Sequence, residues 1–514
     1  MKKGDIIEGT IENYSFPNKG SFLLDDRKIV VKGGLPGTTA RIRITKKKSG
    51  YAEGIIQETL KASPLETKKP VCPHFYECGG CAYQNVAYNN QLRLKEQMVK
   101  ELLSAVVEEL PWEGIEPSPD PLQYRNKMEF SFGDAEKDGP LTLGLHRQGS
   151  SYDILEVKGC AIVRPACNEI LKFTQKFFRE HKVSFYHKMQ HYGILRHLVI
   201  RQSFADGGIL VNLVTTTRHE LPPAGTVTDG LEKAGLRNEV IEELHLPEYV
   251  AGLLRLENSG CFETLSSHSH LAGVLYTEND SLADAVVCDS LTKLYGDDFL
   301  MEELLGLKFR ISPFSFFQTN TRGCEVLYKK VREFVLSACP DGKAGVIYDL
   351  YCGTGTIAQI LSPIADKVYG IEIVEEAVEA ARENAKLNHL KNCEFLAGDV
   401  LKMLDEIEEK PDFIVLDPPR DGCTPKALDR ILSYGVDNIV YVSCKPTSLA
   451  RDLVTMQQRG YRVVRAAATD EYPQTLHVET VVLMNNKNAK PKDYVEIGID
   501  AEEYYNIKDS EKVE

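Results

Sequence analysis

The pattern of hydrophobic and polar positions changes character twice along the chain. Residues 4–60 contain short alternating runs, as in Ala40-Arg41-Ile42-Arg43-Ile44, and glycine and proline interrupt these runs at residues 33–37. Several short strands at this spacing are typical of a small β-barrel. We therefore expect an OB-like barrel over residues 1–62. A linker then leads into a cysteine cluster and a helical segment at residues 88–107.

The segment from about residue 120 to residue 300 is mixed. Strand-like runs, such as residues 197–201 and 209–214, alternate with helical patterns at residues 166–180 and 238–246. This mixture predicts an α+β domain with mostly antiparallel strands. Together with the cysteine cluster, it makes up the expected central domain, residues 63–310.

Regular α/β alternation begins near residue 324. Seven strand-like runs follow, and the last two have no helix between them: 346–351, 367–373, 393–397, 412–416, 438–442, 461–466 and 478–484. This order predicts a C-terminal α/β, Rossmann-like domain at residues 311–486, with a seven-stranded sheet whose last strand is antiparallel. The polar residues 487–514 are expected to form an acidic C-terminal extension.

Length and composition exclude several protein classes. The 514 residues, 43% of them hydrophobic, indicate about three domains of an ordinary globular protein. No apolar run is long enough to span a membrane, and no apolar segment follows the first residues as in a secretory signal. Thirteen scattered cysteines, an odd number, favour reduced thiols and a cytoplasmic location over a disulfide framework.

The charge is unevenly distributed. The chain has a net charge of −14, yet residues 1–70 contain 14 Lys and Arg against 8 Asp and Glu. A local basic module on an acidic protein suits nucleic acid held at one end of the molecule. A solvated basic loop is an equally good explanation of the charge taken alone.

A glycine-rich loop follows the first strand of the α/β region. Gly353-Thr354-Gly355 lets the backbone turn tightly and approach a ligand at the start of a helix. The absence of a third glycine disfavours a dinucleotide. Glu372 and Asp399 end the next two strands, where their carboxylates can accept hydrogen bonds from ribose hydroxyls and from an adenine amino group. The alternative is a plain Rossmann-like sheet with acidic helix caps.

A thiol and two carboxylates in the same region suggest chemistry. Cys444 follows an apolar strand, Asp417 begins an Asp-Pro-Pro-Arg turn after another, and Glu479 begins the last strand. Methylation of a pyrimidine at C5 requires a thiolate that attacks C6 and a base that later removes the C5 proton. We expect Cys444 to be the nucleophile and Glu479 to be the base. The helix that follows Cys444 would help if it lowered the pKa of the thiol. A nitrogen methyltransferase is disfavoured because Arg420, rather than an aromatic residue, follows the two prolines.

Three cysteines lie within ten residues in the spacing C-x5-C-x2-C: Cys72, Cys78 and Cys81. Such a cluster favours a metal centre, with Cys160 as the expected fourth ligand and Cys167 as the second candidate. All-thiolate ligation suits either zinc or a [4Fe–4S] cluster, and the spacing does not separate them. Free packing cysteines are the alternative, and we expect His74 to be a bystander.

Together these residues resemble the RNA uracil-5 methyltransferase family, specifically its 23S ribosomal RNA branch, the RumA/RlmD-like enzymes. The resemblance covers about residues 5–60 and 70–485 and rests on motifs at 78–81, 124–127, 315–320, 349–356, 417–420, 443–446 and 473–479. It implies that the N-terminal barrel is a TRAM domain that binds RNA. It also implies a class I, S-adenosylmethionine-dependent methyltransferase fold at the C-terminus.

The resemblance assigns roles residue by residue. It implies a structural [4Fe–4S] cluster on Cys72, Cys78, Cys81 and Cys160, with zinc as the runner-up. It implies S-adenosylmethionine contacts from Gln318, Tyr351, Thr356, Glu372 and Asp417, with Asp399 near the adenine. Cys444 and Glu479 match the nucleophile and the base. Arg125 and Lys127 are expected to contact phosphates, and loops of the middle domain are expected to receive a flipped-out base.

The expected partner is RNA, namely 23S ribosomal RNA or a large-subunit precursor, bound by a monomer with no obligate protein partner. A transfer RNA enzyme, an RNA-binding assembly factor with incidental methylation, and a redox-sensing iron–sulfur protein are the alternatives. Two residues depart from the family pattern, Lys445 in place of Asn and Tyr472 in place of Phe. The segment around residues 240–270 is longer than usual, and the acidic tail is extra.

Overall fold

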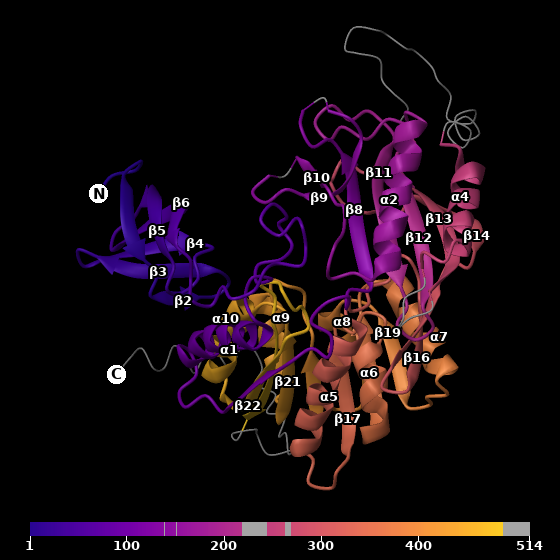
Figure 1. Ribbon diagram of the computed structural model, residues 1–514. Helices are drawn as coiled ribbons and strands as arrows, with labels where there is room; N and C mark the ends of the chain where they lie inside the picture. The colour runs from indigo at the N-terminus through magenta and orange to yellow at the C-terminus, as the bar shows by residue number, and fades with distance from the viewer. Residues whose placement is uncertain (138, 151, 218–243, 263–268, 487–514) are drawn as a thin grey trace, which may run out of the picture.

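The computed structural model describes residues 1–137, 139–150, 152–217, 244–262 and 269–486 (Figure 1). The expected C-terminal extension and most of the helix expected at 238–246 lie outside the described residues. The chain forms a strand-rich N-terminal unit, a central α+β unit and a C-terminal α/β unit (Figure 1). None of the helices in the described ranges is both long and apolar enough to cross a membrane.

The N-terminal unit is one six-stranded sheet of order β1-β5-β6-β4-β3-β2. Alternate side chains of β5 (Thr39–Lys47) are buried, and Ile42 and Ile44 enter a small apolar core. The sheet curls so tightly that Gly9 faces the Phe22 ring, where an added Cβ would lie 2.2 Å from a ring carbon. The other strands are β1 (Ile6–Thr10), β2 (Asn13–Ser15), β3 (Lys19–Leu24), β4 (Arg27–Lys32) and β6 (Tyr51–Lys61).

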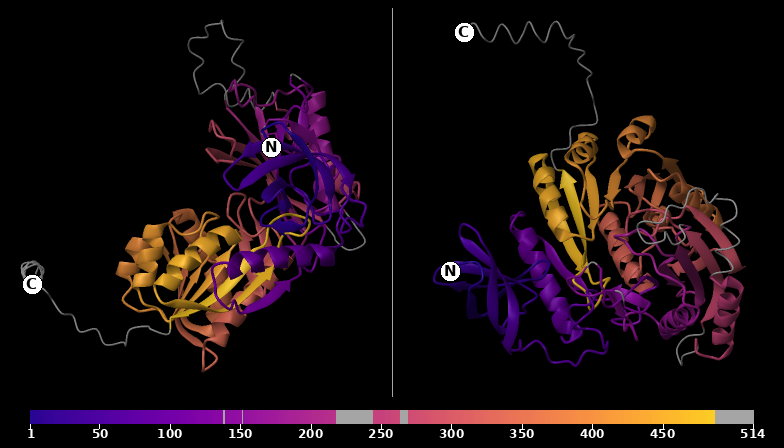
Figure 2. Two further views of the ribbon diagram at one scale, coloured as in Figure 1. Left: turned by 90° about the vertical axis from the view of Figure 1, so that its left-hand side faces the viewer. Right: turned by 90° about the horizontal axis from the view of Figure 1, so that it is seen from above.

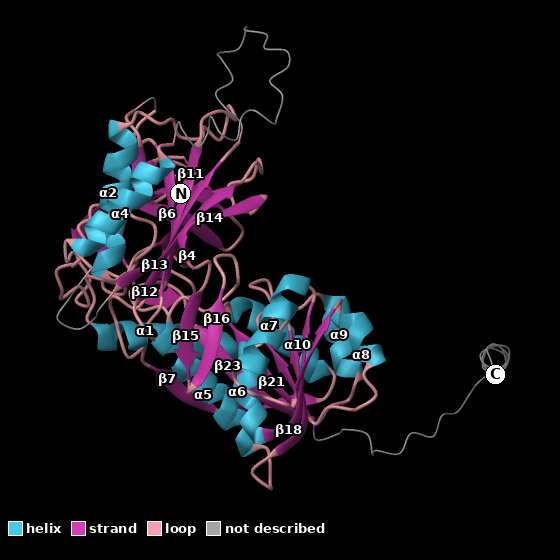
Figure 3. Cartoon of the chain, turned by 90° about the vertical axis from the view of Figure 1, so that its right-hand side faces the viewer, coloured by secondary structure: helices cyan, strands magenta, loops and turns pink. Residues whose placement is uncertain are grey.

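The central unit is a seven-stranded sheet of order β10-β9-β8-β11-β12-β13-β14, and one pair, β12 with β13, is parallel. Its strands are β8 (Lys127–Gly133), β9 (Thr142–His146), β10 (Ile154–Glu156), β11 (Leu195–Gln202), β12 (Gly208–Thr215), β13 (His270–Glu278) and β14 (Ser290–Gly296). Helices α2 (Pro165–Glu180) and α4 (Leu246–Asn258) pack side by side on one face of this sheet (Figure 3).

The C-terminal unit has eight strands in the order β19-β18-β17-β20-β21-β23-β22-β7. Seven of them match the predicted runs: β17 (Ala344–Leu350), β18 (Ala365–Glu372), β19 (Cys393–Ala397), β20 (Phe413–Leu416), β21 (Asn438–Ser443), β22 (Tyr461–Thr469) and β23 (Glu479–Asn486). β23 is antiparallel to both of its neighbours, as the sequence predicted.

The prediction of seven strands was wrong, because β7 (Trp112–Glu116) adds an eighth strand, parallel to β22. This strand comes from more than 340 residues earlier in the chain, so local alternation could not assign it to this sheet. Its five residues include Gly114 at a positive φ of 107° and show little periodicity. The open edge of β22 provides the hydrogen-bonding partner that the short segment lacks by itself.

Helix α1 (Tyr88–Ser104), expected within the central domain, packs on the C-terminal unit instead. Val99 and Leu103 enter the apolar core beneath β21 and β23. Leu94 and Met98 join Tyr14 of the N-terminal unit in a separate small cluster. Helix α1 therefore lies between the N-terminal sheet and the C-terminal sheet, as two further views show (Figure 2).

The remaining elements cover the C-terminal sheet and connect it to the central unit. They are the hairpin β15 (Leu300–Leu304) and β16 (Leu307–Ile311), with α5 (Thr321–Ser337), α6 (Thr356–Leu361), η1 (Ser362–Ile364), α7 (Glu375–Leu387), α8 (Val400–Glu406), α9 (Pro425–Ser433) and α10 (Pro446–Gln458). Phe309 of the hairpin and Phe334 of α5 share one apolar core with β17 and β20. This packing brings the segment before α5 to the carboxyl edge of the sheet.

Candidate active site and cysteine cluster

Three of the predicted cofactor residues lie side by side at the carboxyl edge of the C-terminal sheet. Tyr351 directly follows β17, Glu372 ends β18 and Asp417 directly follows β20. Leu350 pairs in register with the residues that precede Glu372 and Asp417, so the three strand ends are level. In open α/β sheets this edge is where ligands bind.

The predicted nucleophile and base face each other on the same edge. Cys444 follows β21, and Glu479 begins the antiparallel strand β23. Ser443 pairs in register with Thr480, so the next positions along the two strands bring Cys444 and Glu479 across from each other. Glu479 is buried, whereas Cys444 is partly exposed. The strand order therefore brings together two residues that are 35 positions apart in the chain.

The glycine loop has the shape of a ligand cradle. Gly353 has a φ of 53° and would point a Cβ into open space, with no atom within 4 Å. Glu372 lies against this loop, and its Oε2 accepts a hydrogen bond from the Gly353 N–H at 3.1 Å. Thr356 begins helix α6 directly behind the loop, so the helix amino terminus faces the same space. These features fit the ribose and carboxylate groups of an adenosyl cofactor.

Gln318 reaches the site from the segment before α5. Its backbone oxygen accepts from Asn126 Nδ2 at 2.9 Å, and its side-chain Oε1 accepts from the Tyr472 hydroxyl at 2.9 Å. Tyr472 is one of the two departures from the family pattern, and its additional hydroxyl thus orients a predicted cofactor contact. Asp399 lies near Tyr351, following Gly398, whose N–H donates to Glu372 O at 2.8 Å.

Burial and mutual repulsion dominate the electrostatics of the crevice. Burial, followed by the charge of Asp417, raises the pKa of Glu479 to about 8. Burial alone raises the pKa of Asp417 to about 7. A base with a pKa near neutrality can take a proton and release it again under physiological conditions.

The Cys444 thiol does not have the lowered pKa that the sequence suggested. Helix α10 does begin two residues later, at Pro446, but burial raises the pKa of Cys444 to about 12, and Glu479 and Asp417 add to this effect. Arg420 opposes it. In the free protein the thiol is therefore protonated, and the nucleophile needs a change of surroundings or a proton acceptor to become a thiolate.

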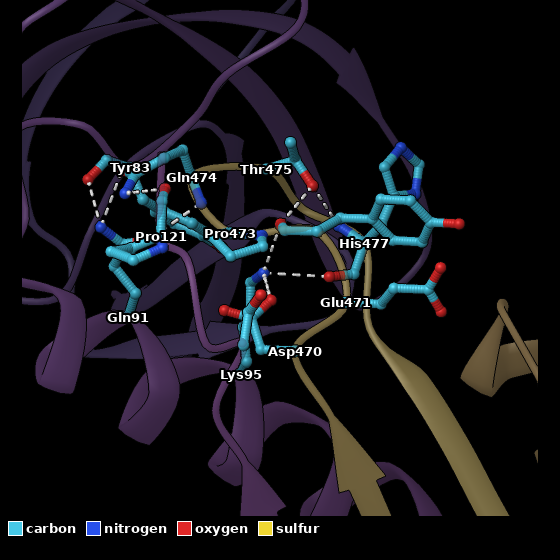
Figure 4. A network of polar contacts seen from close by, with 12 residues as sticks. Tyr83, Gln91, Lys95, Pro121, Asp470, Glu471, Pro473, Gln474, Thr475 and His477 are labelled. Atoms are coloured by element: carbon cyan, nitrogen blue, oxygen red, sulfur yellow. Dashed lines mark hydrogen bonds and ion pairs between the residues drawn. The ribbon is translucent and has the colours of Figure 1, made fainter. Parts of the chain in front are cut away.

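Two functional candidates in this region were missed by the sequence analysis. Glu471 is fully buried, and among the described residues neither of its carboxylate oxygens has a hydrogen-bond partner. Burial and the neighbouring Glu479 raise its pKa well above the usual range. Lys95 of α1 is also fully buried and donates to Asp470 (Figure 4). The sequence around Lys95 does not distinguish it from a surface lysine of an amphipathic helix. Glu471, in contrast, lies two residues before the 473–479 motif, and this position could have identified it as a candidate.

The four cysteines expected to bind metal are close together. Cys81 interacts electrostatically with each of the other three, Cys72, Cys78 and Cys160, and burial raises its pKa to about 12. Cys72 Sγ also lies 3.6 Å from the backbone oxygen that precedes Cys160. Buried thiols with raised pKa values become thiolates when a metal binds them, so the donor set fits an all-cysteine centre.

The residues around the thiols support this fit. The Gln84 amide lies between two of these cysteines. Its Oε1 accepts from the Cys72 N–H at 2.9 Å, and its side chain is within hydrogen-bonding reach of the Cys81 sulfur, so its Nε2 can donate to a metal-bound sulfur. Cys167, the second candidate, is buried in the apolar core beneath α2. His74 Nε2 accepts from the Lys158 N–H at 2.9 Å.

Several basic residues expected to meet phosphates are already paired. Lys127 lies 2.5 Å from Glu129, and Arg125 Nε donates to the Lys127 backbone oxygen at 2.9 Å. In the N-terminal sheet, Arg41 forms ion pairs with Glu8 and Glu58. Arg43, two residues further along the same strand, is exposed and has no ion-pair partner among the described residues.

Comparison with known proteins identifies the family. The model of the tRNA (uracil-5-)-methyltransferase family matches residues 293–487. An RNA methyltransferase from Clostridium tetani is 43% identical over 95% of this chain and 99% of its own length. Another, from Caldanaerobacter subterraneus subsp. tengcongensis, is 44% identical over 94% of this chain and 99% of its own. The chain belongs to the RNA (uracil-5) methyltransferase family.

A solved structure shares the multidomain arrangement of this methyltransferase. The tRNA (uracil-54, C5)-methyltransferase of Pyrococcus abyssi, in complex with S-adenosyl-L-homocysteine, matches with a TM-score of 0.66 and 24% identity. The match covers 93% of this chain and all of the other. It supports a strand-rich N-terminal unit joined to a C-terminal methyltransferase fold.

Proposed function

We propose that this enzyme methylates C5 of a specific uridine in 23S ribosomal RNA, or in its large-subunit precursor, through a covalent bond between Cys444 and C6. The arrangement of Cys444 opposite Glu479 at the carboxyl edge of the sheet, beside the glycine loop, is the observation that supports this chemistry. An RNA-binding factor with incidental methylation would not require a buried carboxylate with a pKa near neutrality, Glu479, next to the thiol of Cys444.

The residues of the crevice suit each step. The Cys444 sulfur adds to C6 of uracil while its proton passes to a neighbouring carboxylate, for which Asp417 is the candidate, and the charge moves onto the ring as an enolate. When bound, S-adenosylmethionine supplies the methyl group that C5 accepts. Glu479 then removes the C5 proton, the bond between sulfur and C6 breaks, and the ring double bond is restored.

The cysteine cluster is proposed to hold a structural [4Fe–4S] cluster on Cys72, Cys78, Cys81 and Cys160. Four sulfurs bound to one zinc ion at 2.3 Å lie roughly 3.8 Å apart. Among the described residues, one group of three candidate ligand atoms lies within 4.8 Å of one another, and it contains no cysteine. The wider spacing of the sulfurs favours the larger cluster over zinc, the runner-up.

The barrel is proposed to be a TRAM domain that contacts RNA outside the crevice, and the enzyme is proposed to act as a cytoplasmic monomer. A transfer RNA substrate is the second candidate. It is favoured by the Pyrococcus abyssi structure, whose name gives a tRNA target and whose match extends over the whole of that chain. Architecture alone therefore does not separate the two substrates.

The substrate is tested by methyl transfer from labelled S-adenosylmethionine to deproteinised total RNA, resolved by size and digested for mass spectrometry. Label in large-subunit ribosomal RNA as 5-methyluridine supports the proposal. Label in transfer RNA keeps the chemistry and overturns the choice of substrate. If no RNA fraction is labelled, the same assay on ribosomal particles from cells lacking the enzyme decides whether the substrate is a particle.

The covalent mechanism is tested with two variants. Cys444→Ala should abolish methyl transfer while S-adenosylmethionine affinity stays within a few-fold of wild type. Glu479→Gln should trap a protein–RNA adduct that survives a denaturing gel, because the C5 proton is no longer removed. Normal turnover by Cys444→Ala contradicts the nucleophile, and ready product release by Glu479→Gln contradicts the base.

A further inference from the structure

The loop between β22 and β23, residues 470–477, is held in place by side chains of helix α1, which lies more than 340 residues earlier in the chain. The Nζ of Lys95, from α1, makes three polar contacts with this loop (Figure 4). Its Nζ lies 2.5 Å from Asp470 Oδ1, 3.0 Å from Tyr472 O and 3.0 Å from His477 O. An ammonium has three donors and no acceptor, so Lys95 is fully satisfied without water.

The three acceptors lie on both sides of the loop. Asp470 and Tyr472 stand at its beginning, and His477 stands two residues before Glu479. The ammonium therefore joins the two ends of the loop at one point. Because Lys95 is fully buried, its removal leaves three acceptors at a site that bulk solvent does not reach in the intact structure.

The same loop reaches the cofactor side of the crevice. Its Tyr472 hydroxyl donates to Gln318 Oε1 at 2.9 Å, while the Tyr472 backbone oxygen accepts from Lys95. Lys95 is therefore connected to two predicted functional residues. It contacts His477, two residues before the base Glu479, and it contacts Tyr472, which hydrogen-bonds the cofactor residue Gln318.

We propose that Lys95 is a positioning residue for Glu479 and Gln318, which it aligns by closing the 470–477 loop. The proposal rests on the proposed function, in which Glu479 removes the C5 proton. Lys95 does not touch substrate. It fixes the direction in which β23 leaves the loop, and so the distance from the Glu479 carboxylate to a uracil bound on Cys444.

Helix α1 offers a matched control one turn earlier. Gln91 is equally buried, and its Nε2 donates to Gln474 Oε1 at 2.9 Å and to the backbone oxygens of Tyr83 and Val86. Its contacts reach the middle of the loop but neither end of it. Loss of Gln91 should weaken the same helix–loop contact without releasing the residues that Lys95 holds.

The test compares Lys95→Met/Asp470→Asn with Gln91→Leu. The double variant removes both charges, so that neither partner remains buried alone. Covalent adduct and methylated product are quantified in single turnover, and S-adenosylmethionine affinity is measured by titration. We expect the adduct-to-product ratio to rise at least tenfold in the double variant and cofactor affinity to fall several-fold, with both near wild type in Gln91→Leu.

A purely structural role predicts a different result. In that case both variants have lower melting temperatures than wild type but keep the wild-type adduct-to-product ratio. This outcome overturns the proposal. If the double variant does not fold, Lys95→Gln/Asp470→Asn, which also leaves no buried charge but keeps two donors toward the loop, is measured at low temperature on the same ratio. If Glu479→Gln itself forms no adduct, the proposed function fails instead, so the two failures are distinguishable.

A separate observation concerns the outer end of the central unit. His181 caps the end of α2, and His245 and Glu248 lie at the start of α4. His181 Nε2 is 3.4 Å and His245 Nδ1 is 3.9 Å from Glu248 Oε2, and all three ligand atoms lie within 4.8 Å of one another. Donors bonded to one tetrahedral zinc ion at about 2.0 Å are roughly 3.3 Å apart.

The tautomer of His181 also suits a ligand. Its Nδ1 lies 2.8 Å from Phe177 O, and because a carbonyl only accepts, Nδ1 must carry the hydrogen. In the neutral ring the lone pair is then on Nε2, which faces Glu248. A histidine that donates its other ring N–H to a backbone carbonyl is the usual arrangement in metal sites. We infer that His181, His245 and Glu248 form a second metal site, for one zinc-like divalent cation that joins α2 to α4.

The test is equilibrium dialysis of the cluster-bearing protein against zinc, with metal content measured on wild type and variants. Wild type should hold one more zinc than His181→Ala or His245→Ala, and zinc should raise its melting temperature by mass action. The control is Glu180→Gln, which removes a carboxylate of the same helix outside the group and should keep the extra zinc. Equal zinc content in wild type and both histidine variants overturns the site.

Discussion

Asp470 and Glu471 are adjacent in the chain and equally buried, but their surroundings are opposite. Asp470 Oδ1 meets the Lys95 ammonium at 2.5 Å, whereas no described residue hydrogen-bonds either oxygen of Glu471 (Figure 4). The first carboxylate fixes a loop through its ion pair with Lys95. The second has no ion-pair partner among the described residues, and burial and Glu479 raise its pKa well above the usual range.

This contrast separates structural acids from functional ones. A close cation stabilises the ionised form of a buried carboxylate, and the Lys95 Nζ lies 2.5 Å from Asp470 Oδ1. A buried carboxylate that must exchange a proton cannot be paired so tightly, because a close cation would hold its pKa low. Glu479 and Asp417 follow the second pattern, with pKa values raised to about 8 and about 7. These unpaired carboxyl groups lower the stability of the fold at neutral pH, but they can gain and lose protons in that range.

The largest expected effect on stability comes from breaking the one tight pair. Lys95→Met leaves Asp470 buried and unpaired, and loss of one partner of a buried ion pair costs roughly 3–5 kcal/mol. Lys95→Met/Asp470→Asn should recover much of this loss, since no lone charge remains. Denaturant titration of both variants measures the difference. Equal losses would show that packing of the lysine stem, rather than charge pairing, stabilises the loop.

The carboxylate of Glu479 should make decay of the covalent adduct depend on pH. Glu479 must be ionised to remove the C5 proton, and its pKa is raised to about 8 by burial and by Asp417. Decay of the covalent adduct should therefore accelerate about tenfold per pH unit below 8 and level off above it. Asp417→Asn should move the plateau to lower pH, as measured by quenching a preformed adduct at timed intervals. A flat profile between pH 6 and 8 would contradict the assignment.

The same group should destabilise the fold at neutral pH. A carboxyl whose pKa is higher in the folded than in the unfolded state binds more protons when folded, so stability falls as pH rises from about 4.5 to 8. Glu479→Gln removes this penalty and should stabilise the protein by roughly 1–3 kcal/mol at pH 7.5. The gain should nearly vanish at pH 5, and Glu471→Gln should behave likewise. A gain that is the same at both pH values would point to packing instead.

Much of the architecture could be predicted because its signals are local. The seven strands of the α/β region, the antiparallel last strand and the curled N-terminal sheet all follow from periodicity and turn residues. The level strand ends that bring Tyr351, Glu372 and Asp417 together also follow, because parallel strands share one carboxyl edge. These features need no knowledge of distant contacts.

What the sequence could not supply depends on long-range packing. Strand β7 and helix α1 join the C-terminal unit across more than 340 residues, so nothing near Trp112 or Lys95 predicts their partners. The pKa of Cys444 was expected to fall because a helix follows it, but burial outweighs that local effect. The raised pKa of Glu471 likewise depends on burial, which is a property of the fold. The assignments of ligand and substrate residues stay predictions until the variants are measured.

The smallest expected effect extends the contrast of paired and unpaired groups to the barrel surface. Arg41 is neutralised by Glu8 and Glu58, whereas Arg43 on the same strand has no ion-pair partner among the described residues. If the barrel contacts phosphates, Arg43→Ala should lower RNA affinity several-fold and reduce the slope of log affinity against log salt by about 1. Arg41→Ala should change the RNA affinity and the salt slope much less, because the Arg41 guanidinium is already paired with two carboxylates. Filter binding at several salt concentrations compares them, and an equal loss from both arginines would mean that the Arg41 ion pairs open when RNA binds.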